Sequence, residues 1–136
     1  MNNLLTAIYG KTVGSNMSLD VLGRVYLDEA PQGVEYPYIV FFVVSDVPAD
    51  TFTESIEDIL VQFSIFSASP GAIEITGIYN DMVALLDNCS LTITSDEHIF
   101  MVRQNLTTMV DDITTPSGTE RVKHWAVDYQ IMVQRL

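Results

Sequence analysis

The side chains most able to bind a metal or move a proton in this sequence are its only histidines, His98 and His124. Asp96 and Glu97 precede His98 directly, and imidazole and carboxylate groups are common metal ligands. The sequence has no H-x-x-x-H pair and no further well-spaced ligand of the kind that a zinc site requires. The alternatives are a metal site near His98 and two exposed histidines on strands, and we expect the second.

Acidic neighbours form another group of candidates, as the pairs Glu57-Asp58 and Asp111-Asp112. Successive side chains of a strand point to opposite faces, so we expect solvated hairpin ends here rather than a catalytic pair of carboxylates. Cys89, the single cysteine, lies at the end of a predicted helix without an evident histidine partner. We interpret it as a small buried apolar side chain rather than a nucleophile.

Motifs for phosphate binding and for hydrolysis are missing from the chain. It contains no G-x-x-x-x-G-K-[ST], no G-x-G-x-x-G and no G-x-S-x-G segment. We therefore expect that the protein is not an enzyme and that it has no catalytic residues, no cofactor and no resident metal.

The charge of the chain limits its partners. Its 136 residues include 18 acidic and 6 basic side chains, for a net charge of −12 at pH 7. Tight non-specific binding to DNA or to an anionic membrane needs surplus lysine and arginine, so we expect neither. The acidity suits a surface that repels nucleic acid, or merely a soluble acidic protein. The N-terminus is a poor signal peptide, and no apolar run approaches the ~18 residues of a membrane helix. The single cysteine, Cys89, cannot form a disulfide within the chain, which fits a reducing cytoplasm.

The elements that must position these side chains are organised around the stretch from Gly23 to Phe42. It predicts a short strand at Arg24–Leu27, a polar turn, and a long strand from Tyr38 to Ser45. The run from Tyr38 to Val44 is apolar at every position. Both faces of this strand should therefore be covered, by the protein itself or by a partner.

Apolar periodicity predicts the remaining elements. Spacing of 3.6 residues indicates helices at residues 3–13 and 69–88, the second capped by Ser69, with a short turn at Ser18–Leu22 capped by Ser18. Alternation indicates further strands at Glu54–Ser67, Leu91–Thr94, His98–Met109 and Arg121–Gln134. We expect one α+β domain over residues 1–136, with a largely antiparallel or mixed β-sheet, two helices packed on one face, and projecting hairpin loops.

Loops and basic residues supply the candidate assembly contacts. The loop Asp46–Thr53 is longer than a hairpin needs, and it carries an apolar ring, Phe52, near its tip. If the last two strands pair, their basic residues could gather for salt bridges between subunits, or stay scattered as solubilising charges. The candidate contacts are Pro48, Asp50, Phe52, Arg103, Pro116, Arg121 and Lys123.

The order of these features resembles the tail completion, or tail terminator, proteins of long-tailed bacteriophages and prophages. The resemblance covers the chain from about Leu4 to Val133. It departs from the family at Phe63–Ser67, where relatives often carry a tryptophan before the serine. It rests on the segments Arg24-Val25-Tyr26, Ala30-Pro31-Gln32-Gly33, Tyr36-Pro37-Tyr38-Ile39-Val40, Leu60 to Phe66, Leu85-Leu86 and Trp125 to Val133.

The resemblance implies a structural subunit of the virion, assembled in the host cytoplasm. Such a subunit forms a ring, usually a hexamer, that caps the head-proximal end of the tail tube and joins it to the head–tail connector protein. DNA would pass through the ring without tight binding, and no membrane would be involved. The alternatives are another head–tail joining subunit, such as a connector adaptor or stopper, and a small acidic ligand-binding domain or enzyme. The last would need a convergent polar pocket, which no set of residues indicates.

Overall fold

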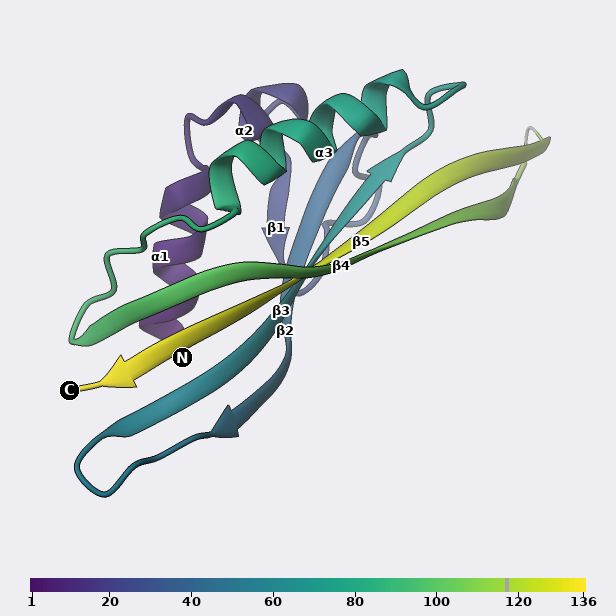
Figure 1. Cartoon of the computed structure of the whole chain (residues 1–136). Helices are drawn as coiled ribbons and strands as arrows, with labels where there is room; N and C mark the ends of the chain where they lie inside the picture. Colours follow the sequence, from purple (N-terminus) through teal and green to yellow (C-terminus); the bar gives the residue numbers. More distant parts are fainter. Residues whose placement is uncertain (117) are drawn as a thin grey trace.

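The computed structural model describes residues 1–116 and 118–136 as a five-stranded sheet with three helices on one side of it (Figure 1). This arrangement confirms the predicted α+β class. The helices are α1 (Asn2–Thr12), α2 (Asn16–Asp20) and α3 (Ile73–Leu86), and the strands are β1 (Val25–Leu27), β2 (Tyr38–Pro48), β3 (Ser55–Ser67), β4 (Asp96–Thr115) and β5 (Gly118–Arg135).

The sheet is mixed, with the strand order β1-β2-β3-β5-β4. β1 runs parallel to β2, and the other neighbours are antiparallel. The β3–β5 pairing is continuous from Ser55↔Arg135 to Ser67↔Lys123, whereas β2 and β4 each carry register shifts. The short β1 and the long β4 are therefore the edge strands, and β3 lies at the centre.

The core lies between the sheet and the helices. Phe63 of β3 is fully buried and stacks on Phe41 of β2 at 5.4 Å between ring centroids, with Tyr129 of β5 edge-on at 5.7 Å. These rings occupy the alternate positions that face the helices. The apolar stripe of α3 closes the core from above with Ile75, Ile78, Met82 and Leu86.

A shared carboxylate fastens the end of α3 to the sheet. Asp87 accepts a hydrogen bond from the Tyr129 hydroxyl at 2.6 Å and pairs with the Arg103 guanidinium at 3.3 Å. Arg103 also lies over the Tyr79 ring of α3, 5.6 Å from its centroid, and donates to the Tyr79 hydroxyl. Burial, with the Asp87 hydrogen bond, raises the pKa of Tyr129, so its hydroxyl stays a donor.

Several predicted boundaries were wrong. Leu91–Thr94 forms no strand: Leu91 and Ile93 are buried, but in an irregular segment whose Leu91 N–H donates to His98 Nδ1 at 3.3 Å. Their alternation reflects packing against the core, not sheet pairing. The helix predicted from Ser69 begins at Ile73, because Gly71 adopts a φ of 76°.

The short turn predicted at Ser18–Leu22 is a helix, α2, whose cap is Ser15 rather than Ser18. The Ser15 hydroxyl accepts a hydrogen bond from the Ser18 N–H at 3.2 Å. The three strands β2, β4 and β5 extend beyond their predicted ends, and two long hairpins project from opposite ends of the sheet (Figure 1). None of the helices in the described residues has the length and apolar run that crossing a bilayer requires.

Truncating Phe63 tests this account of the core. Phe63→Ala removes a fully buried ring with two aromatic neighbours, so we expect it to lower the free energy of unfolding by ~3–5 kcal/mol. Phe52→Ala is the matched control, because that ring is fully exposed and its loss should change stability by less than ~0.5 kcal/mol. Urea unfolding monitored by circular dichroism measures both, and equal effects would contradict the placement of the core.

Candidate assembly surface

The face of the sheet opposite the helices, called here the open face, carries a row of aromatic side chains. Tyr38, Phe66 and His124 are register partners on β2, β3 and β5, and Met109 continues the row on β4. The Tyr38 and Phe66 rings stack at 4.8 Å, and the Phe66 and His124 rings at 4.4 Å. The row crosses four strands, so its cross-strand contacts stabilise the pairing of neighbouring strands across the sheet.

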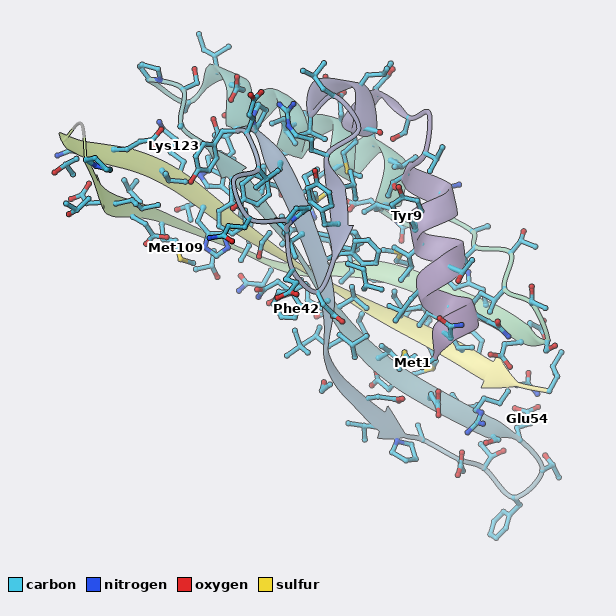
Figure 2. The ribbon with its side chains drawn as sticks, turned by 180° about the vertical axis from the view of Figure 1, so that it is seen from behind. Met1, Tyr9, Phe42, Glu54, Met109 and Lys123 are labelled. Carbon is cyan, nitrogen blue, oxygen red and sulfur yellow. The ribbon has the colours of Figure 1, made fainter. Side chains whose placement is uncertain are left out.

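The connection between β1 and β2 folds over one part of the open face (Figure 2). Arg24 holds it in place by donating to the carbonyl oxygens of Tyr36 at 3.2 Å and Pro37 at 3.0 Å. A groove of about 600 Å³ remains between this connection and the sheet. We call it the aromatic groove; its walls include Ala30, Val34, Tyr36, Tyr38, Phe42 and Phe66.

Beyond the aromatic groove the open face becomes polar and acidic. Gln62 Nε2 donates to Asp128 at 2.9 Å, and Gln130 Nε2 donates to both oxygens of Asp58 at 2.9 and 3.0 Å. Gln104 Nε2 donates to Gln130 Oε1 at 2.8 Å. These bonds between side chains hold the polar groups in fixed positions across β3, β5 and β4.

The alternation of the strands separates charges between the two faces. In the described residues, the basic side chains of β4 and β5 all fall on the helix side, where Arg103 binds Asp87, Arg135 contacts Glu57, and Lys123 donates to the carbonyl of Ser69 at 2.7 Å. The open face carries carboxylates, among them Asp58, Asp111 and Asp128. The field over the part of this face formed by β3, β4 and β5 is therefore negative, and Arg24 lies farther away, at the connection between β1 and β2.

The loop of residues 49–54 is a braced projection that presents Phe52. Asp50 Oδ1 accepts from the Ile56 N–H at 3.0 Å and from the Ser55 hydroxyl at 3.3 Å. The Thr51 N–H donates to the Glu54 carbonyl at 3.0 Å, which closes the tip. Phe52 is fully exposed, so it is no part of the core. Asp50 has a clear role within its own loop, and whether the loop contacts another subunit stays a prediction.

The basic candidates do not gather into one patch. Arg103 pairs in register with Tyr129, whereas Lys123 pairs with Val110 farther along the hairpin. Arg121 forms an exposed ion pair with Asp112 at 3.4 Å. The pairing of the strands was predicted correctly, but each base already has a partner in its own chain. Pro48 ends β2 and Pro116 lies in the tip of the β4–β5 hairpin, both exposed.

The two histidines are half-buried rather than exposed, which corrects the expectation for both. The Nε2 atoms of His98 and His124 are buried and have no hydrogen-bond partner among the described residues. No group of three or more metal-binding side chains comes together in residues 1–116 and 118–136. Cys89 is half-buried with its sulfur 3.5 Å from the Met101 sulfur, and burial raises the pKa of its thiol.

Sequence reasoning missed the aromatic groove and the aromatic row. A signal for the row was present, because Tyr38, Phe66 and His124 occupy the alternate positions left over when the core-facing residues are assigned. The groove had no comparable signal, because it depends on how the connection after β1 folds back. The sequence indicated no convergent polar pocket, and the walls of this groove are largely aromatic and aliphatic.

The fold and this surface define a small α+β domain with one sheet face covered by helices and the other largely open. Residues 6–134 match the family described as tail completion protein gp17. The chain belongs to this family of structural phage tail proteins, which confirms the resemblance found in the sequence. No curated protein sequence matches the chain.

A solved structure has the same fold. A chain from the virion of a native gene transfer agent particle superposes with a TM-score of 0.65 at 12% identity, covering 95% of this chain and 94% of that one. At such low identity the likeness establishes the common fold alone.

The aromatic row makes stability depend on pH. Burial lowers the pKa of His124 below its usual ~6.5, and the Asp111 carboxylate opposes this only in part. As the pH falls from ~7 to ~5, the unfolded chain therefore binds a proton before the folded chain does, and stability decreases. His124→Phe keeps a ring in the stack and removes the titration.

We expect the variant to lose less of its thermal midpoint than the wild type between these two pH values. His98, whose pKa burial also lowers, accounts for part of the remaining loss. Thermal unfolding at both pH values provides the measurement. An identical pH dependence of the two proteins would contradict the role given to His124.

Proposed function

We propose that this protein is the ring-forming subunit that ends the tail tube at its head-proximal end and joins it to the head connector. Membership of the tail completion family carries the proposal. Two features of the structure support it: strand edges without partners, and a negative open face.

The unpaired edges favour association. β1 pairs with β2 only as far as Phe41, so the outer edge of β2 from Phe42 to Pro48 has no backbone partner among the described residues. On the other side of the sheet, Met101 of β4 accepts a backbone bond from Asn88, and beyond it the outer edge is also open in the described part of the chain. Long open edges are templates for pairing with another chain, and a ring would cover both.

The charge of the open face supports a channel for DNA. In a ring, one surface of each subunit lines the channel, and a passing duplex must not bind to it. In the described residues, the strands β2 to β5 place carboxylates and amides but no lysine or arginine on the open face, and such a surface repels phosphates. The open face meets this description better than the helix side, so we assign the open face to the channel.

Ring formation can be measured directly. We expect the purified protein, alone or with tail tubes, to assemble into closed rings, six-fold by the family resemblance. Light scattering gives the mass, and negative-stain images give the symmetry and the position on the tube. A protein that stays monomeric even with tubes would contradict the proposal. Rings that bind the connector but never tubes would identify it instead as an adaptor or stopper.

A separate experiment tests whether the open face lines the channel. Wild-type protein should bind duplex DNA no more tightly than micromolar at ~0.15 M salt. Gln104→Lys with Asp111→Lys adds charge on exposed open-face positions of β4. Particles carrying this variant should assemble but release DNA more slowly, as followed with a DNA-binding dye.

The matched control is Thr6→Lys with Asp20→Lys, which makes the same change in net charge on exposed helix positions. Particles with this control should release DNA at the wild-type rate. If the control slowed release and the open-face variant did not, the helices would face the channel.

A further inference from the structure

Phe52 and the aromatic groove are complementary features at opposite ends of the same two strands. The groove lies at the end of the sheet where β2 begins and β3 ends, beside Tyr38 and Phe66. The loop of residues 49–54 lies at the other end, roughly 35 Å away along β2. Figure 2 shows this separation between the label of Lys123, near the groove end, and that of Glu54, in the loop.

The loop of residues 49–54 exposes its aromatic ring on a backbone that is held by hydrogen bonds. An exposed phenyl group makes no favourable interaction with water. Packing against an apolar surface would bury ~150–250 Å² of this side chain. The hydrogen bonds of Asp50 and the Ala49 N–H bond to the Ile56 carbonyl at 2.8 Å already order the loop. Little further conformational entropy would be lost on binding, which is how rigid aromatic residues become anchors.

The groove has matching chemistry. Its walls combine the stacked rings of Tyr36, Tyr38 and Phe66 with aliphatic carbons of Val34 and Val40. Its volume of about 600 Å³ exceeds what one phenyl ring occupies, so the ring could enter together with neighbouring loop residues. Aromatic rings at such distances favour a further offset or edge-on ring.

We propose that Phe52 of one copy inserts into the aromatic groove of the next copy. The Phe52 loop and the aromatic groove are different surfaces of one chain, so the contact is head-to-tail. Repeating it closes a ring or extends a filament. The inference rests on the proposed ring and specifies its subunit contact. The phenyl ring alone buries too little for a stable interface, which needs ~1,200–2,000 Å², so the surfaces around the loop and the groove must supply the rest.

The charges around the contact give it a recognisable salt dependence. Asp28 and Glu29 line the groove, and Asp50 and Glu54 flank the inserted ring. Like charges oppose association at low ionic strength, and screening removes this opposition. Self-association should therefore strengthen between ~0.05 M and ~0.5 M salt, whereas a contact built on ion pairs would weaken.

Disulfide trapping tests the contact in the full chain. In a Cys89→Ala background, Thr53→Cys places a thiol beside Phe52, and Ala30→Cys places one in the wall of the groove. Oxidation of the double variant should give a ladder of covalent oligomers that ends at the ring size. Thr53→Cys with Thr6→Cys, whose second thiol lies on exposed α1, is the matched control and should give no such ladder.

Two variants probe the anchor itself. Adding Phe52→Ala to the trapping pair should lower the yield of oligomers at least about tenfold. In the otherwise native chain, Ala30→Trp should fill the groove and weaken self-association by a similar factor, with an unchanged thermal midpoint.

The outcomes separate this inference from the proposed ring. If wild-type protein forms closed rings while the trapping pair cross-links no better than its control, the ring stands and the Phe52 contact is wrong. A ladder that depends on Phe52, in a protein that forms only open filaments, would support the contact and contradict the ring. Self-association that weakens with salt and ignores both Phe52→Ala and Ala30→Trp would also overturn the contact.

Discussion

The continuous pairing of β3 with β5 is the constraint on which the rest of the structure depends. Side chains alternate strictly along both strands, so this register decides which residues face the helices and which face outward. If β5 slipped by one residue against β3, Tyr129 would turn to the open face and Asp128 would enter the core, while Phe63 stayed buried. The core, the aromatic row and the segregation of charge all follow from a single register.

Much of the fold could be predicted because its local patterns agree with its tertiary structure. The apolar stripe of α3 and the alternation from Ile59 to Ile65 each identified an element and the face it buries. Errors arose where a local sequence pattern had a cause other than the element that it predicted. Leu91 and Ile93 alternate like a strand but pack from an irregular segment, and Gly71 delays a helix that Ser69 was expected to begin.

The candidate site was predictable only in part. Phe52 stood out because an aromatic ring in a polar loop is unusual, and its exposure agrees with that observation. The groove could not be predicted, because it depends on Arg24 holding backbone carbonyls that lie 12 and 13 residues farther along the chain. Arg103, Arg121 and Lys123 were chosen as candidates only because they are basic. The strand register places them at different positions, where each one has its own partner.

The unbroken register also has a mechanical consequence. Hydrogen bonds between antiparallel strands lie perpendicular to the strand direction. A force that pulls β3 and β5 apart along their length therefore loads every pair from Ser55↔Arg135 to Ser67↔Lys123 at once, so no single bond can open first. A pull on the outer edge of β4 would instead open its pairs one after another, like a zipper. The sheet is thus strong along its strands and weak across its edge, and a particle under tension is safest when the strands lie along the force.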